Sequence, residues 1–199
     1  MSTAPELAEL VERMRSLIDA AVTTLAPPET LREAETTLRA VEASLRRHVP
    51  DPVPPRYTGG ATVAEVFPYD PLVGRMSPLA PPVEMVWQDT LAVGTARFGT
   101  PYEGPPGCVH GGVLAAVFDQ VLNVANMSSG IAGPTKRLEI KYKKPTPLRT
   151  ELRFEGWVER QEGREVYSAG RVLAGTEVTA EARGVFVRIP LDRVMRMLD

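Results

Sequence analysis

Asp119 is the one charged side chain between Glu103 and Lys136, with histidine counted as neutral. The apolar residues around it recur at helical spacing and predict one helix over about 111–127. Asn123 and Asn126 follow Asp119 at i+4 and i+7, so the three form a polar stripe opposite the apolar face. Burial raises the pKa of a carboxylate, which makes a better base at neutral pH. The stripe therefore favours a general base, with a purely structural carboxylate as the alternative.

His110, Gly111 and Gly112 stand at the predicted start of this helix. The first backbone N–H groups of a helix lack acceptors within it, and glycine lets a ligand approach them closely. With the positive end of the helix dipole, such a turn can stabilise an oxyanion. Because Asp119 follows two turns later, the spacing favours attack by an activated water on a carbonyl held at the turn. The same glycines could instead serve close packing of the helix against a strand.

Other kinds of active site have weaker support. Cys108 and His110 are two residues apart, a spacing that does not by itself bring them together as a nucleophile and base. His48 adds only one more candidate for a soft metal ligand, so we expect no zinc site. Ser128 and Ser129 lack the G-x-S-x-G turn of a nucleophilic serine, and no glycine-rich phosphate loop is present.

The composition is that of a globular protein and excludes several classes. The 199 residues carry 23 Lys and Arg against 25 Asp and Glu, and 43% are hydrophobic. A net charge of -2 predicts no nucleic-acid partner, and one cysteine cannot form an internal disulfide. The sequence has neither a secretory start nor a run of about 20 apolar residues. We therefore expect a cytoplasmic protein without membrane contact.

Residues 1–49 predict an amphipathic helical hairpin, broken at Pro27 and Pro28. Thr30 and Glu33 have the spacing of a capping box at the start of the second helix. The polar faces mix both signs of charge, which favours a structural appendage or a dimer arm over a membrane helix.

Residues 50–82 hold nine prolines, which exclude a long helix or a central strand. The segment also carries many aromatic and aliphatic side chains, unlike a flexible linker. It predicts an ordered wrap over the domain, which is either a plain surface loop or part of a pocket wall.

Residues 83–199 predict the main domain. Residues 83–98 have the pattern of one long strand with a bend at Gly94, and glycines at 161–164 and 174–176 predict tight hairpins. The apolar helix at 111–127 must be buried. The expected fold is therefore α+β, a curved antiparallel sheet wrapped around one long central helix, with the helical hairpin as an N-terminal extension.

Three stretches resemble the PaaI-type hotdog-fold acyl-CoA thioesterases, a family within the 4-hydroxybenzoyl-CoA thioesterase superfamily. They are SPLAPPVEM at 77–85, GPPGCVHGGVLAAVFD at 104–119 and TKRLEIKYKKPTPL at 135–148. The similarity covers about 77–188 and leaves out the helical hairpin and most of the wrap. It implies a hotdog fold and hydrolysis of an acyl-CoA to the free acid and CoA. It implies no cofactor other than the coenzyme A of the substrate.

The resemblance also implies roles for single residues. The Gly111 amide would polarise the thioester carbonyl, and Asp119 would act as general base or nucleophile. His110 would position the turn, together with Gly112, and contact the thioester. In this family the turn and the acidic residue of one site come from different subunits. The resemblance therefore implies a homodimer or a dimer of dimers with active sites at the subunit interface.

Three further positions bear on the expected site. Asn123 and Thr135 match places where relatives have a hydroxyl or polar group near the attacking water. Gly104 is a departure, because some relatives have Asn or Gln seven residues before the oxyanion glycine. Carbonyl polarisation would then rest on the helix start alone or on a donor from elsewhere.

Charge is unevenly distributed along the domain. Residues 136–188 carry 12 Lys or Arg against 8 Glu, whereas 51–135 carry 3 basic and 7 acidic residues. The phosphates of coenzyme A would prefer the first surface. The candidate phosphate-binding residues are Lys141, Lys143, Lys144 and Arg149, which could also serve solubility alone. Two alternatives to hydrolysis are a non-catalytic acyl-CoA-binding hotdog protein and a hydratase, whose usual motifs we do not find.

Overall fold

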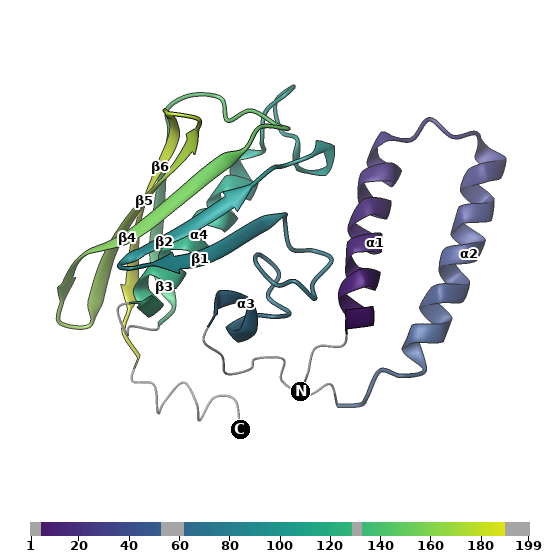
Figure 1. Ribbon diagram of the computed structural model, residues 1–199, viewed down its shortest axis with the longest axis horizontal. Helices are drawn as coiled ribbons and strands as arrows, with labels where there is room; N and C mark the ends of the chain where they lie inside the picture. Colours follow the sequence, from purple (N-terminus) through teal and green to yellow (C-terminus); the bar gives the residue numbers. More distant parts are fainter. Residues whose placement is uncertain (1–4, 53–61, 129–132, 190–199) are drawn as a thin grey trace.

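The computed structural model describes residues 5–52, 62–128 and 133–189. A six-stranded antiparallel sheet lies against one long helix, α4, and two helices, α1 and α2, stand beside one edge of the sheet (Figure 1). This is the α+β architecture that the sequence predicts. Within the described residues, no helix is long and apolar enough to span a membrane.

The sheet has the strand order β1-β2-β4-β5-β6-β3, so β1 and β3 are its edges. Tight turns at Gly163 and Gly175, with φ of 58° and 62°, join its three longest strands as hairpins, as predicted. The strands are β1 Val83–Gln88, β2 Leu91–Ala96, β3 Thr135–Tyr142, β4 Leu152–Glu162, β5 Glu165–Ala174 and β6 Glu177–Val187.

The prediction of a single strand over 83–98 is wrong. The segment folds back on itself, because β1 and β2 pair antiparallel with Gln88 opposite Leu91. Asp89 makes the turn with a φ of 53°, a conformation that aspartate tolerates better than most residues. Gly94, the expected bend, lies inside β2 opposite Met85.

Helix α4, Gly111–Ser128, packs across the sheet and forms the centre of the core. Val121 and Leu122 are fully buried and lie over Gly156, Gly170 and Gly184 on three adjacent strands. A Cβ atom at Gly156 would stand only 2.7 Å from Cγ1 of Val121. The three glycines therefore let the helix approach the sheet closely, which sets the position of every residue that α4 carries.

Residues 62–82 of the proline-rich segment pack on the domain. It contains one short helix, α3 Val63–Val66, whose capping box is formed by Thr62 and Glu65. Val63, Phe67 and Val73 are buried in the same core as α4. The segment also lines a cavity of about 800 Å³ between α1 and β1, together with residues of both elements. The wrap thus forms part of a pocket wall, and a functional role for that pocket stays a prediction. Residues 53–61 lie outside the described part of the chain.

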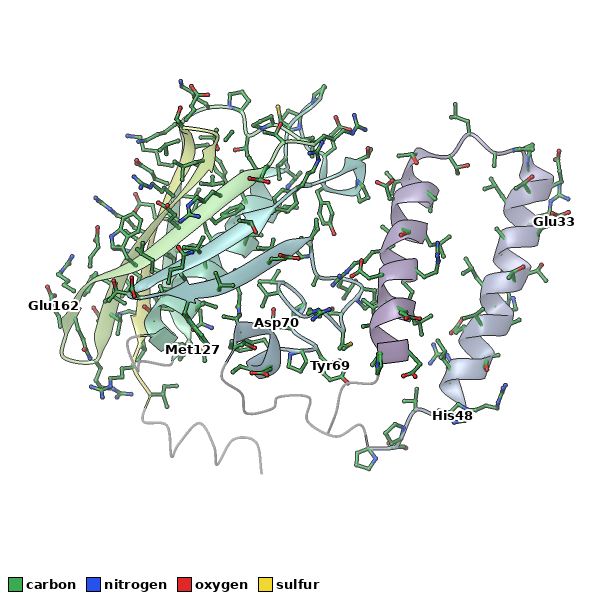
Figure 2. The ribbon with its side chains drawn as sticks, in the orientation of Figure 1. Glu33, His48, Tyr69, Asp70, Met127 and Glu162 are labelled. Carbon is green, nitrogen blue, oxygen red and sulfur yellow. The ribbon has the colours of Figure 1, made fainter. Side chains whose placement is uncertain are left out.

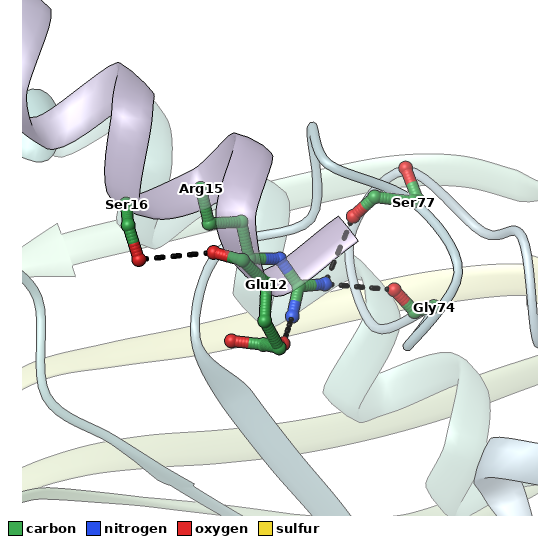
Figure 3. A network of polar contacts seen from close by, with 5 residues as sticks. All are labelled: Glu12, Arg15, Ser16, Gly74 and Ser77. Atoms are coloured by element: carbon green, nitrogen blue, oxygen red, sulfur yellow. Dashed lines mark hydrogen bonds and ion pairs between the residues drawn. The ribbon is translucent and has the colours of Figure 1, made fainter. Parts of the chain in front are cut away.

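The N-terminal arm consists of α1, Pro5–Thr23, and α2, Pro28–Arg46. Helix α1 is attached to the domain through buried Val11 and through Arg15, whose Nη2 donates to the carbonyl oxygens of Gly74 and Ser77 at 3.0 and 2.8 Å (Figure 3). This clamp joins the arm to the proline-rich segment.

The expected capping box at the start of α2 is absent. The helix begins at Pro28, before Thr30, and its N-cap residue Pro27 makes no side-chain capping bond. Proline presets a helical φ and has no N–H that needs an acceptor, so it can begin a helix without a capping hydroxyl.

Candidate functional site

The turn before α4 leaves one backbone N–H group free. The His110 N–H donates to the Tyr102 carbonyl at 2.9 Å, and the Gly112 N–H donates to Nδ1 of His110 at 2.9 Å. The Gly111 N–H has no acceptor in the described chain. It stands at the positive end of the helix, so it is the donor that a carbonyl oxygen could reach.

The bond from Gly112 also orients the His110 ring. An accepting Nδ1 fits the tautomer of the imidazole ring that carries its hydrogen on Nε2. The side chain is exposed. In that tautomer, the exposed ring of His110 offers an Nε2–H donor.

Gly104 lies against this turn. A Cβ atom built there would be 2.7 Å from Cα of His110 and 3.1 Å from its Cβ. The Gly104 N–H also donates to the Cys108 carbonyl at 2.9 Å and closes the loop before the helix. The departure from Asn or Gln thus has a steric reason, because no side chain fits at 104 while His110 keeps its place.

Tyr142 is a residue of the site that sequence reasoning missed. Its hydroxyl donates to the Gly111 carbonyl at 2.8 Å, from the end of edge strand β3. The ring also lies where a side chain at Gly111 would point, with the hydroxyl 3.2 Å from a Cβ built there. Tyr142 belongs to the stretch 135–148 that carries the resemblance, but the pattern alone does not show that it reaches the helix start.

The stretch that follows Tyr142 runs beside the turn. The Val109 N–H donates to the Thr146 carbonyl at 2.8 Å, and the Leu148 N–H donates to the Gly107 carbonyl at 2.9 Å. Two segments far apart in the sequence are thereby fixed side by side at the N-terminal end of α4.

Asp119 lies at a different level of the same helix. Its Oδ1 accepts a hydrogen bond from the Thr135 hydroxyl at 2.7 Å, and the carboxylate is only partly covered. Eight residues separate it from Gly111, which corresponds to about 12 Å along the helix axis. An oxyanion donor and a base that act on one carbonyl must each lie within about 3 Å of its reacting atoms or of the attacking water. One chain therefore does not bring these two groups together.

The asparagines of the predicted stripe have different surroundings. Asn123 is half-buried, one turn beyond Asp119. Asn126 is fully buried, and its Oδ1 accepts from the Ser168 hydroxyl at 2.6 Å. The sheet therefore covers the predicted polar stripe at its C-terminal end.

Of the four candidate phosphate-binding residues, Lys141, Lys143 and Lys144 lie at or just after the end of β3, and Arg149 lies beside Phe98 and Thr100. Lys143 pairs with Glu181 and Lys144 pairs with Glu177, two carboxylates of β6. Arg149 donates to the Thr100 hydroxyl at 2.8 Å, and Lys141 is exposed without a close partner in the described chain. The charges of Lys143 and Lys144 are thus partly balanced by these carboxylates. Both ion pairs depend on the register between β3 and β6.

The cavity beside α1 is separate from this site, although Tyr102 lines it and binds the His110 N–H through its carbonyl. Burial raises the pKa of the Tyr102 hydroxyl. In the described residues, no three His, Cys, Asp or Glu side chains gather closely enough to hold a metal ion.

Comparisons with known proteins agree on one family. The family model described as Thioesterase superfamily matches residues 106–183. Acyl-coenzyme A thioesterase THEM4 of Mus musculus is 32% identical over 93 residues, which are 46% of this chain and 40% of that protein. The same protein of Rattus norvegicus is 31% identical over 97 residues. The chain thus spans about four-tenths of the length of these curated relatives.

Solved structures extend the similarity over nearly the whole chain. The crystal structure of a thioesterase superfamily protein is 32% identical, has a TM-score of 0.81, and covers 94% of this chain and 96% of its own. The E. coli PaaI protein, at 20% identity and a TM-score of 0.51, covers 54% of this chain and 80% of its own, and shows the fold alone. The chain therefore belongs to the thioesterase superfamily and has its hotdog fold.

Proposed function

We propose that the protein hydrolyses an acyl-CoA thioester to a free acid and CoA, in a site formed by two copies of the chain. The observation that carries the proposal is the pair of half-sites on α4, a free Gly111 N–H at its start and an accessible Asp119 two turns along. The Gly111 N–H suits binding of the carbonyl oxygen, and Asp119 suits activation of water. Within one chain the two groups lie too far apart to act on one thioester.

The first half-site receives the carbonyl. The Gly111 N–H donates to the thioester oxygen and stabilises the negative charge that develops there. His110 presents its Nε2–H beside it, and Gly112 fixes the ring by donating to Nδ1. Tyr142 holds the Gly111 peptide from the side of β3.

The second half-site activates water. The Thr135 hydroxyl occupies Oδ1 of Asp119, which leaves the other carboxylate oxygen to take a proton. The water oxygen bonds to the carbonyl carbon while its proton passes to Asp119. The intermediate then collapses, the C–S bond breaks, and the CoA sulfur leaves with the electron pair and takes up a proton. Asn123 is near enough along the helix to help hold the water.

The distance along α4 supports the use of a second copy. With about 12 Å between the two groups, Asp119 of one chain must act on a carbonyl held by Gly111 of another. Lys141, Lys143 and Lys144 lie at the end of β3, whose last residue contacts the turn, and Arg149 follows Leu148, which bonds to the loop before the turn, so the four suit the phosphates of the same substrate. The single cysteine favours a reducing compartment, the cytoplasm, as the place of the reaction.

The test is thiol release from short, medium, long-chain and aromatic acyl-CoAs by the wild type and by Asp119→Asn. The amide keeps the size of the side chain and can still accept from Thr135, but it does not take up a proton. We expect turnover to fall at least 100-fold, in line with the loss of a general base. Asn123→Asp in the Asp119→Asn background moves the carboxylate one turn along α4. It tests whether the carboxylate is needed at position 119. Full activity of Asp119→Asn on the best substrate would remove the proposal.

A non-catalytic acyl-CoA-binding protein is a second candidate, favoured by one observation. Gly104 leaves no room for the amide side chain that some relatives would use as a second donor to the carbonyl. Binding of acyl-CoA by the wild type without release of thiol from any member of the panel would favour this function.

A further inference from the structure

Helix α2 is isolated from the rest of the described chain. None of its 19 residues is buried, and every described side-chain hydrogen bond and ion pair of α2 stays within α2 or joins it to its C-cap residue Arg47. Glu33, in the second turn of α2, and His48, just past its end, lie on the side of the molecule away from the sheet (Figure 2). In proteins, most of the stability of a helix comes from packing of its apolar face rather than from intrinsic helix propensity. Helix α2 therefore needs a partner.

The apolar residues of α2 form a regular stripe. Leu31, Leu38 and Leu45 repeat every seven residues, and Ala34 and Val41 stand between them at alternating steps of three and four. This is the pattern of a two-helix seam with period 3.5. The three leucines are 45–49% exposed, so no other part of the described chain covers them.

Helix α1 does not cover the stripe, because its own apolar residues are exposed. Met14, Leu17 and Ile18 are each 38–40% exposed on a helix that runs antiparallel beside α2 (Figure 1). The arm thus presents two uncovered apolar stripes. A membrane does not suit them, because the polar face of α2 carries both Glu and Arg.

The charges of α2 are complementary to those of an antiparallel copy of α2. Residues 28–37 carry Glu29, Glu33 and Glu35 against one arginine, a net charge of -2, whereas residues 38–47 carry three arginines against Glu42, a net charge of +2. Antiparallel pairing places the acidic half of each helix beside the basic half of the other, and parallel pairing places like charges together.

We propose that the arm is a self-association element in which α2 pairs antiparallel with α2 of a second copy along the stripe Leu31, Ala34, Leu38, Val41 and Leu45. The two-fold axis passes near the middle of the helix, so Leu38 of one chain faces Leu38 of the other. The two hairpins then form a four-helix layer, in which the stripes of α1 flank the central pair.

The first experiment measures mass in solution by light scattering over a dilution series. Leu38→Glu/Leu45→Glu places two charges on the stripe, and Thr36→Glu/Ala43→Glu places two charges at the same spacing on the opposite face of α2. We expect the first variant to have half the mass of the wild type at concentrations where the wild type remains associated, and the control to match the wild type. Equal masses for all three proteins would overturn the proposal.

The second experiment separates arm pairing from any association through the sheet domain. In a Cys108→Ser background, Leu38→Cys places one thiol at the proposed axis, and Ala43→Cys places one on the opposite face. A short bis-maleimide should join two Leu38→Cys chains efficiently and two Ala43→Cys chains poorly. Equal cross-linking of both variants, or of neither, would show that α2 does not pair in this way, whatever the mass of the wild type.

Discussion

The close contact between α4 and the sheet predicts that adding a side chain at Gly156 destabilises the protein. A Cβ at Gly156 would lie 2.7 Å from Val121 Cγ1 and 3.1 Å from the Val121 carbonyl oxygen. Val121 is fully buried, so it has little room to move. Overpacking of this kind costs about 1–3 kcal/mol, and the smaller entropy of unfolded alanine returns about 0.4–1 kcal/mol. We expect Gly156→Ala to destabilise the protein by about 1–2 kcal/mol.

Gly94 is the matched control on the neighbouring strand β2. A Cβ there would meet nothing closer than 3.4 Å, an ordinary contact, so Gly94→Ala should be neutral or slightly stabilising. Urea unfolding followed by tryptophan fluorescence measures both variants. Val121→Ala in the Gly156→Ala background should cost less than the two single changes added together. Equal stability of Gly156→Ala and Gly94→Ala would refute the close approach of α4 to β4.

Three further predictions concern the site and the sheet. Tyr142→Phe removes one hydrogen bond to the helix carbonyl, worth about 0.5–1.5 kcal/mol, and should lower kcat about 3- to 10-fold with little change in KM; a changed KM at constant kcat would contradict a role at the turn. Gly104→Ala should displace His110 and lower kcat further than Gly94→Ala, whose added Cβ meets nothing closer than 3.4 Å; equal losses would show that the contact is unimportant. The Arg153 hydrogen bond holds the pKa of Glu155 below its usual range, so the stability it adds is present above about pH 4.3 and is lost as the pH falls through the lowered pKa. The stability difference between wild type and Glu155→Gln, measured by urea unfolding, should therefore shrink between pH 7 and pH 3; a constant difference would exclude this origin.

The sequence predicts well those parts of the fold that depend on local pattern. The apolar period of 111–127 and the glycines at 163 and 175 indicate a buried helix and two hairpins, and the structure has them. The turn at Asp89 was missed because alternation of apolar residues continues on both sides of it, with no glycine or proline to mark it. The start of α2 was misplaced because a capping pattern at Thr30 competes with the proline that begins the helix.

The residues of the candidate site fall into two similar groups, those that local sequence pattern predicts and those that depend on contacts between distant segments. Residues on one short segment, such as His110 and Gly111, could be chosen from the sequence because their chemistry depends on the helix start. The contact of Tyr142 with Gly111 and the pairing of Lys143 with Glu181 depend on how distant segments meet. Helical period gives the direction of Asn126 around the helix, but it does not show that the sheet covers that end.

The contact between Gly104 and His110 has a consequence for how sequences of this family can change. A mutation that replaced Gly104 with an amide-bearing residue would displace the turn before the new donor could help the reaction. The loop of residues 105–109 would have to be remodelled first or at the same time. An amide-bearing residue at position 104 therefore requires coordinated changes in the loop, and a single substitution there should be harmful to the turn.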